Sequence, residues 1–140
     1  MATPLPPPPT FNAMLICDNA IREEGSRKIS LIGVFASILS STFPAVHGSL
    51  CVYVNLGEAE GRYQLRLELL RADTMQVIGR GESSIEPSDR MEPTEIVFEM
   101  QGLLFEYPGR YEFVLHANNN FVGKKSFRVL KLGQQPGESR

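Results

Sequence analysis

The sequence predicts an all-β protein in which about seven to eight antiparallel strands form a β-sandwich. Three observations support this prediction. Short segments alternate apolar and polar residues, an arrangement that buries one face of a strand and leaves the other in water. Turn residues separate these segments at regular intervals, and no segment has a convincing helical periodicity. The 140 residues are also enough for a single domain with its own core.

The first three expected strands are separated by polar or proline-containing segments. Residues 12–21 form the first strand, which ends at the polar run 23–26. Residues 28–39 form a long apolar second strand. A connection at 43–48 follows, and the third strand then spans residues 50–56. Glycine and proline in these connections interrupt regular pairing, so they mark the strand ends.

The central strands have the clearest alternation. In residues 62–71 the apolar positions are Tyr63, Leu65, Leu67 and Leu69. Residues 77–85 follow a turn at 72–75, and a polar loop precedes the strand at 95–100. In that strand the alternating apolar positions are Ile96, Phe98 and Met100. We expect these residues to form the core, where each buried Leu or Phe contributes roughly 1.5–3 kcal/mol.

A turn at Pro108-Gly109 leads directly into the strand at 111–117, which begins with Tyr111. On this strand Glu112 and His116 lie on the face opposite Tyr111. A tyrosine placed just after such a turn is typical of immunoglobulin-like sandwiches, in which its hydroxyl binds back to the preceding connection. We therefore predict an immunoglobulin-like sandwich with Pro108, Gly109 and Tyr111 as a structural corner.

The last two expected strands, 111–117 and 121–129, are joined by the three asparagines at 118–120. Asparagine tolerates the positive φ that tight hairpin turns require. The sequence therefore predicts a hairpin at this position.

The two ends of the chain differ from the part between them. Residues 1–10 contain five prolines, which favour an extended polyproline conformation that cannot pair as a strand. This leader is either a stiff extension or a ligand for a proline-binding groove. Residues 133–140 are polar and are expected to be disordered. The sandwich domain is therefore predicted to span residues 11–132.

The expected strand at 28–39 is apolar on both faces, although a sandwich buries only one face of each strand. The second face needs a cover, which the proline-rich leader, the loop at 43–46 or a second subunit would supply. A bulge at Gly33 that exchanges the two faces would also account for the pattern. If a partner provides the cover, the surface residues we expect are Ile32, Val34, Ile38, Phe43 and Val46.

The charge balance argues against two classes of partner. The formal net charge is −2, and the basic residues are scattered among acidic ones. Nucleic-acid binding requires a basic stripe, and an acidic membrane attracts a basic patch. No apolar run approaches the roughly 18 residues of a membrane span. We therefore expect neither a nucleic-acid nor a membrane partner.

Cysteine and histidine are the only residues that suggest catalysis. Cys17 or Cys51 with His47 or His116 would provide a nucleophile and a base if the fold brought them together. We expect His47 in a loop and His116 on the exposed face of its strand. Both thiols lie in apolar segments without an export signal, so we expect them reduced, in the cytoplasm. The spacing fits no metal-site pattern, and we expect no cofactor.

Several separated segments together resemble a known family. They occur in the order 14–18, 30–35, 43–47 and 108–113, followed by 121–129. The chain resembles a small bacterial all-β family of unknown function over roughly residues 12–130. The resemblance implies a compact all-β domain of bacterial, cytosolic origin. The family has no agreed activity, so the resemblance assigns no catalytic residue.

From the sequence we expect a non-catalytic binding or assembly module that associates with a protein partner or with itself. The alternative is a small thiol-dependent enzyme that uses Cys17 or Cys51. A reactive thiol distinguishes the two, because an enzyme of this kind requires a depressed thiol pKa.

Overall fold

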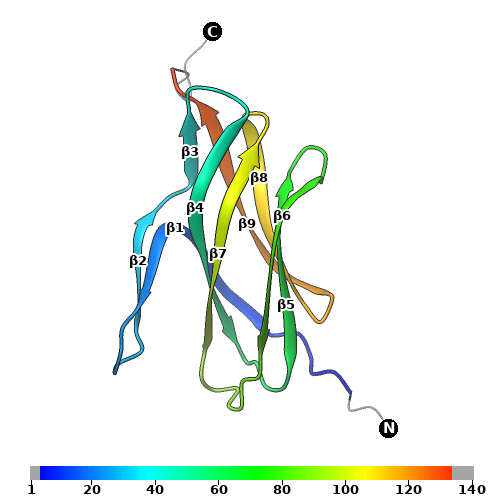
Figure 1. Cartoon of the computed structure of the whole chain (residues 1–140). Helices are drawn as coiled ribbons and strands as arrows, with labels where there is room; N and C mark the ends of the chain where they lie inside the picture. Colours follow the sequence, from blue (N-terminus) through cyan, green and yellow to red (C-terminus); the bar gives the residue numbers. More distant parts are fainter. Residues whose placement is uncertain (1–3, 134–140) are drawn as a thin grey trace.

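The computed structural model describes residues 4–133, which form two β-sheets that pack face to face (Figure 1). Within this range there are nine strands and no helix. The strands are β1 (Thr10–Arg22), β2 (Ile29–Val34), β3 (Ser37–Ser40), β4 (Ala45–Gly57), β5 (Tyr63–Arg71), β6 (Val77–Ile85), β7 (Thr94–Phe105), β8 (Gly109–Ala117) and β9 (Asn120–Lys131). One sheet has the order β2-β1-β4-β7 and the other β3-β9-β8-β5-β6. The all-β prediction is confirmed.

The prediction of a purely antiparallel sandwich needs correction. The five-stranded sheet is mixed, because β3 pairs with β9 in parallel from Ser37↔Arg128 to Ser40↔Lys131. The other neighbouring strands pair antiparallel. The extra strand arises because the single strand expected at 28–39 is divided between the two sheets as β2 and β3.

The division occurs at Phe35 and Ala36. The backbone N–H of Phe35 still donates to the carbonyl of Ile16 in the first sheet, at 2.9 Å. The carbonyl of Ala36 already accepts a hydrogen bond from the N–H of Arg128 in the second sheet, at 3.2 Å. The chain therefore passes from one sheet to the other within two residues. This passage explains only part of the two-sided apolar pattern of residues 28–39, because Ile38 enters the core whereas Ile32 and Val34 stay about half exposed.

Gly33 does not form the bulge that would have exchanged the faces. The β1–β2 register runs without a shift from Arg22↔Ile29 to Cys17↔Val34. Gly33 instead adopts a φ of 71°, and a side chain there would collide with the carboxylate of Asp18. Both the positive φ and the close approach of the Asp18 carboxylate favour glycine at this position.

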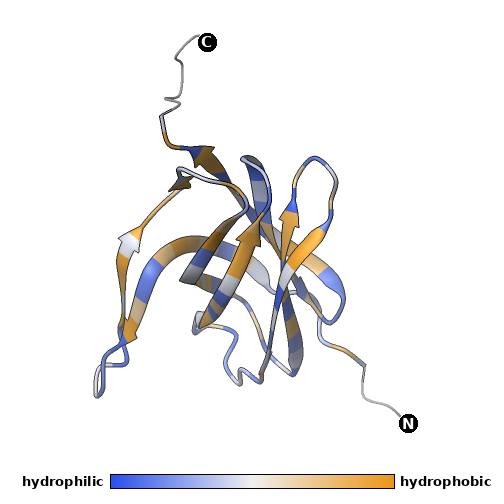
Figure 2. Ribbon diagram, turned by 45° about the horizontal axis from the view of Figure 1, so that its top comes forward, coloured by the Kyte–Doolittle hydropathy of each residue, from blue (hydrophilic) through white to orange (hydrophobic). Residues whose placement is uncertain are grey.

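The core lies between the sheets and contains the residues that the alternation predicts. The predicted apolar positions of β5 and β7 are all buried. Figure 2 shows apolar bands alternating with polar ones along these strands. An aromatic group fills one end of the core: Phe105 packs edge-on against Tyr111, and Phe127 stacks on Phe113. Such contacts contribute beyond the area that they bury.

The two turns near the end of the chain have defined backbone and hydrogen-bond geometry. Asn118 and Asn119 have φ values of 50° and 68° and join β8 to β9 as a two-residue hairpin loop. At the corner, the Tyr111 hydroxyl donates to the carbonyl of Tyr107 at 2.6 Å. This bond ties the start of β8 to the connection that precedes it.

Part of the proline-rich leader packs on the domain. Pro9 is buried, and the carbonyl of Pro7 accepts a hydrogen bond from the Tyr63 hydroxyl at 2.8 Å. A Cβ atom on Gly61 would lie 3.1 Å from the ring of Pro6. The leader therefore lies against the start of β5, and the first strand begins at Thr10. Of the predicted polar tail at 133–140, residues 134–140 lie outside the described residues.

We expect Tyr111→Phe to lower the free energy of unfolding by about 0.5–1.5 kcal/mol, because it removes one hydrogen bond from a buried hydroxyl. Chemical denaturation monitored by circular dichroism measures the change. Tyr107→Phe is the matched control, since it keeps the accepting carbonyl and the ring. Equal stability of the two variants would show that the corner bond contributes nothing.

Candidate interaction surface

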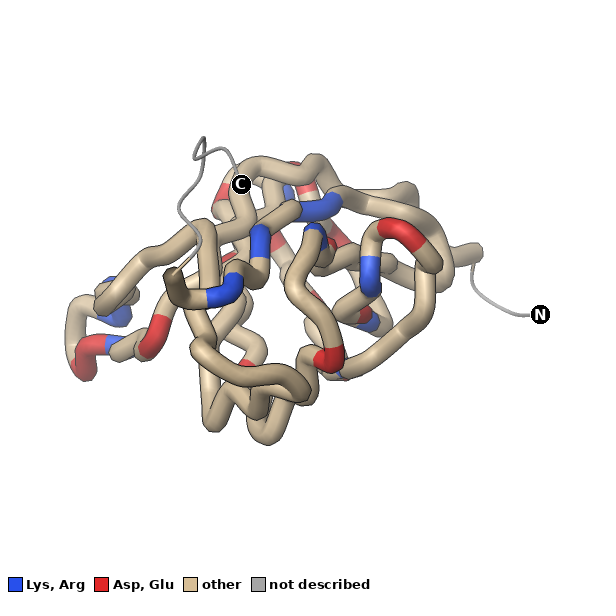
Figure 3. Tube along the Cα trace, turned by 90° about the horizontal axis from the view of Figure 1, so that it is seen from above, with Lys and Arg blue, Asp and Glu red and all other residues tan. Residues whose placement is uncertain are grey.

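The β1–β2 hairpin extends away from the rest of its sheet. The pairing of β1 with β4 ends at Cys17↔Cys51, whereas its pairing with β2 runs from Cys17↔Val34 to Arg22↔Ile29. Residues 17–34 therefore form an arm, which extends to one side of the molecule in Figure 1. At its tip, the N–H of Glu23 donates to the carbonyl of Lys28 at 2.8 Å. Viewed from above in Figure 3, this tip carries charges of both signs.

The arm exposes three large aliphatic side chains. Ile21, Ile32 and Val34 are 52%, 49% and 55% exposed, respectively. They share one face of the arm, because the register places Ile21 opposite Ser30 and Val34 opposite Cys17. A folded domain gains little from aliphatic side chains held in water in this way, so this face is a candidate binding surface.

The outer edge of β2 has no chemical protection against pairing. β2 is the last strand of its sheet, and its sequence Ile-Ser-Leu-Ile-Gly-Val contains neither a charge nor a proline. The other terminal strands of the described region differ: β6 contains Arg80 and Glu82, β7 contains Glu95 and Glu99, and β3 has four residues. Proteins normally blunt their sheet edges with charges, prolines or short strands. The edge of β2 is therefore suited to receive a further strand.

A cleft of about 470 Å³ separates the arm from β7. Its walls are Ala20, Ile21, Arg22 and Ile29 on the arm and Val97 and Glu99 on β7. Arg22 and Glu99 place a cation and an anion on opposite walls of the cleft.

The structure separates the surface residues that the sequence grouped together. Ile38 is only 7% exposed and belongs to the core, so it is not available to a partner. Phe43 is partly buried against the core. Val46 is 70% exposed but pairs with Leu104. It is five residues from Cys51 along β4, or roughly 16 Å from the base of the arm. Only Ile32 and Val34 lie on the arm.

The two cysteines lie opposite each other on neighbouring strands. The register pairs Cys17 with Cys51, and both are free and buried. They alternate with Ile16 and Val52 of the core, so the thiols lie on the outer face of the sheet. The arm covers them there: the Cys17 thiol donates to the carbonyl of Asn19 at 3.3 Å, and the Ala20 backbone hydrogen-bonds the Cys51 thiol.

This cover changes the acidity of both thiols. Burial raises the pKa of Cys17 above its ordinary value, and the neighbouring Cys51 raises it further. Burial likewise raises the pKa of Cys51. A raised pKa lowers the fraction of thiolate, which is the reactive form. The pair is therefore chemically less reactive than exposed cysteine.

The histidines do not meet the thiols. His47 lies in β4, not in a loop as predicted, and is four residues from Cys51, roughly 13 Å along the strand. Its ring is 6.1 Å from that of Phe35. His116 lies on the other sheet and is partly buried, in contrast to the predicted exposure. Between residues 4 and 133, no three Cys, His, Asp or Glu side chains gather as a metal site.

The outer face of the five-stranded sheet carries an ion-pair network that the sequence did not reveal. Glu68 lies 2.9 Å from Arg80 and 4.0 Å from the Nδ1 atom of His116. Glu112 is buried and lies 3.2 Å from Lys124. Alternation placed these residues on the polar face, but which polar residues are covered depends on their cross-strand neighbours. The carboxylates are paired, so the network is explained by the sheet itself.

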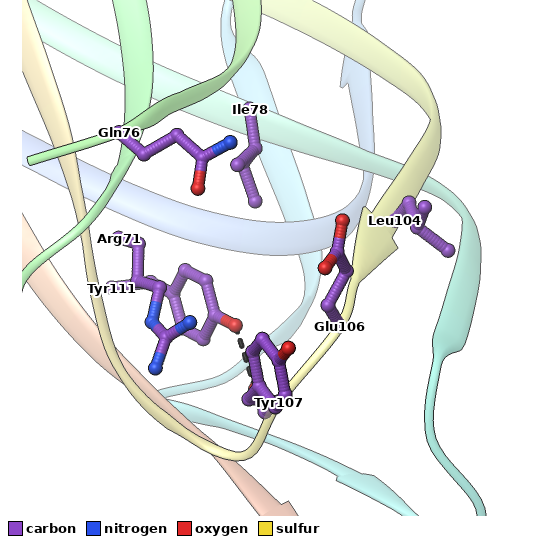
Figure 4. Close-up of a pocket in the computed structure, with 7 residues that line it drawn as sticks. All are labelled: Arg71, Gln76, Ile78, Leu104, Glu106, Tyr107 and Tyr111. Carbon is purple, nitrogen blue, oxygen red and sulfur yellow. Dashed lines mark hydrogen bonds between the residues drawn. The ribbon is translucent and has the colours of Figure 1, made fainter. Parts of the chain in front are cut away.

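A small cavity lies beside the structural corner (Figure 4). The Arg71 guanidinium lies 4.5 Å from the centre of the Tyr107 ring, and Tyr111 closes the inner side. The cavity holds about 20 Å³, which is room for roughly one water molecule. It is too small for a substrate. Across residues 4–133, no helix is long and apolar enough to cross a membrane.

The fold and the surface together define a two-sheet β-domain with a projecting hairpin. The chain belongs to a family of unknown function, DUF6941, whose model matches residues 12–130. The predicted resemblance to an uncharacterised family is thus confirmed over the expected range. The search of curated proteins gives no match.

Three solved structures illustrate the remaining similarity. A Pseudomonas fluorescens alkylpurine DNA glycosylase, AlkC, bound to DNA with an abasic site analog aligns at 10% identity and a TM-score of 0.44 over 68% of this chain and 28% of the glycosylase chain. The β-glucosidase of Listeria innocua aligns at 10% identity and a TM-score of 0.43 over 87% and 16% of the two chains. The β-glucosidase of Kluyveromyces marxianus aligns at 13% identity and a TM-score of 0.41 over 74% of this chain and 16% of the glucosidase chain. The chain thus spans less than a third of the length of each of these proteins. With TM-scores below 0.5, the alignments assign neither a fold family nor a function to this chain.

We expect neither cysteine to react rapidly with an alkylating reagent in the folded protein at neutral pH, because burial and the raised pKa both suppress the thiolate. Mass spectrometry after timed labelling counts the modified thiols. Both are expected to react after unfolding in guanidinium. Native labelling is expected to accelerate only as the pH rises above the ordinary thiol pKa.

Cys17→Ala and Cys51→Ala assign any labelling to one thiol. Rapid native modification of either cysteine at neutral pH would contradict the expectation. It would favour the thiol-dependent enzyme.

Proposed function

We propose that this chain is a non-catalytic binding or assembly module whose arm receives a protein partner. The observation that carries the proposal is the uncharged outer edge of β2 with Ile32 and Val34 exposed beside it. A partner that adds a strand at this edge satisfies backbone groups and covers both side chains at once. A protein strand fits this edge better than nucleic acid or a membrane, since the arm has no basic stripe.

The energetics support a contact centred on these residues. Complete burial of an Ile or Val is worth about 1.5–3 kcal/mol, and both side chains are half exposed. Covering the exposed half of each contributes roughly 1 kcal/mol. Charged residues at the arm tip would then border the apolar contact on one side, as the polar rim of a protein interface does.

The proposal includes an immunoglobulin-like sandwich in the cytoplasm of a bacterium. The Tyr111–Tyr107 bond and the two packed sheets support the first part. The two free thiols support the second, because an oxidising compartment would favour a link between cysteines that lie directly opposite each other.

We expect Ile32→Lys combined with Val34→Lys to abolish association while the fold persists, because the two positions are half exposed and a charge there opposes apolar contact. Light scattering gives the mass of the purified protein, and affinity capture from lysate reports other partners. Circular dichroism checks the fold.

Val46→Lys is the matched control, since Val46 is also an exposed aliphatic residue but lies away from the arm. The proposal is wrong if the double variant folds and retains both the mass and the partners of the original chain. It is also wrong if Val46→Lys has the same effect as the double variant.

A further inference from the structure

We propose that Cys17 and Cys51 form a reversible modification site at the base of the arm. A small disulfide compound such as oxidised glutathione converts the two thiols into an intramolecular disulfide that links β1 to β4, and the arm limits the access of this oxidant. The bond forms within one chain and requires no partner, so it is independent of the proposed function.

The backbone register brings the two cysteines to a separation that a disulfide can span. The Ile16 carbonyl accepts a hydrogen bond from the N–H of Phe35 on the β2 side. Because successive residues of a strand direct their backbone groups to opposite sides, the backbone of Cys17 faces β4 and forms a hydrogen-bonded pair with Cys51. The Cα atoms of such a pair are about 5.5 Å apart. Disulfides span Cα separations of about 4.4–6.8 Å, so the bond requires no change of register.

The buried setting selects a disulfide from among the products of thiol oxidation. Both cysteines are buried on the outer face of the sheet. Sulfinic and sulfonic acids add oxygen atoms and a negative charge, which a site shielded from water opposes. Burial also raises the pKa of both thiols, which is the same resistance to negative charge. A disulfide is uncharged and adds no atoms, so it is the product that this site accommodates.

The arm covers both thiols through two of its own neighbouring residues. The Cys17 thiol donates to the carbonyl of Asn19 at 3.3 Å, and the Ala20 backbone hydrogen-bonds the Cys51 thiol. One displacement of this segment therefore uncovers both sulfur atoms. An oxidant of the size of glutathione reaches them only when the arm moves, so oxidation of the folded protein is slow even where its equilibrium is favourable.

The reaction consists of two successive thiol–disulfide exchanges. One cysteine loses its proton to water, and its thiolate attacks a sulfur atom of oxidised glutathione. The glutathione S–S bond breaks, and one glutathione thiolate leaves. The thiolate of the second cysteine then attacks the Sγ atom of the mixed disulfide and expels the other glutathione thiolate. Each leaving thiolate takes up a proton, so two electrons pass from the cysteines to two molecules of reduced glutathione.

The disulfide closes a loop of chain that contains the arm, β3 and the passage between the sheets. A closed loop restricts the unfolded chain more than the folded one, so the oxidised protein is the more stable form. By linkage, a fold that the bond stabilises also favours the bond. The native structure is therefore expected to promote oxidation at equilibrium, although the arm makes it slow.

The equilibrium is measured on the full chain in graded mixtures of reduced and oxidised glutathione, approached from the reduced and from the oxidised protein. Acid quenching, alkylation and mass spectrometry give the oxidised fraction. We expect the equilibrium constant of oxidation to be at least about tenfold larger for the folded chain than for the same chain unfolded in guanidinium. A constant no larger in the folded chain overturns the proposal, because the fold would then oppose the bond.

Thermal unfolding provides a second measurement. The oxidised protein is expected to melt roughly 5–15 °C above the reduced one, and dithiothreitol is expected to restore the lower temperature. Cys17→Ala and Cys51→Ala are the controls, since neither can form the internal bond. The same treatment is expected to leave their melting temperatures unchanged. An increase in these variants, or an oxidised form that dithiothreitol does not reverse, contradicts the proposal.

A displaced cysteine pair tests the role of the arm. Leu15 and Tyr53 lie opposite each other on the same two strands and the same face, two residues from the natural pair, and are partly exposed. We combine Leu15→Cys and Tyr53→Cys with Cys17→Ala and Cys51→Ala, and circular dichroism checks the fold. The displaced pair is expected to oxidise at least about tenfold faster than the natural pair, because its thiols are more accessible. Equal rates would show that the arm does not control access.

Discussion

The passage of the chain between the two sheets at Phe35 and Ala36 is the constraint on which the rest of the structure depends. One residue is hydrogen-bonded to Ile16 in the first sheet, and the next accepts a bond from Arg128 in the second. A shift of the chain by one residue would break both of these backbone bonds. The passage therefore fixes Ile38 in the core and leaves Val34 outside it.

The arm follows from this division. β1 is longer than its pairing with β4, and β2 supplies the partner for the part beyond Cys17. β4 continues instead along β7 to Ala45↔Phe105. The same arm that exposes Ile32 also covers Cys17 through Asn19. The arm thus carries the open edge of β2 and also covers the thiols. A movement of the arm would change the exposure of the edge and of the thiols together.

The sequence predicted what depends on local pattern. The strict alternation of β5, the asparagine turn and the Tyr111 corner rest on neighbours within a few residues, and each has the predicted form. The division at Phe35 was not predictable, because alternation does not say to which sheet a strand belongs. The parallel β3–β9 pair and the Cys17–Cys51 contact join distant segments, so they depend on register. Because the division between the sheets was not predictable, the sequence grouped Ile38 with Ile32 and Val34, although only the latter two lie on the arm.

The aliphatic residues of β2 are hard to explain by the stability of a single chain. Ile32 is half exposed, so a polar side chain at this position would cost an isolated domain little, whereas Ile38, which follows β2 in the chain, is held by the core. The terminal strands β6 and β7 carry charges. The fold thus tolerates charge at its edges, yet β2 has none. An uncharged edge is a liability for a lone domain and an advantage only when a further strand occupies it.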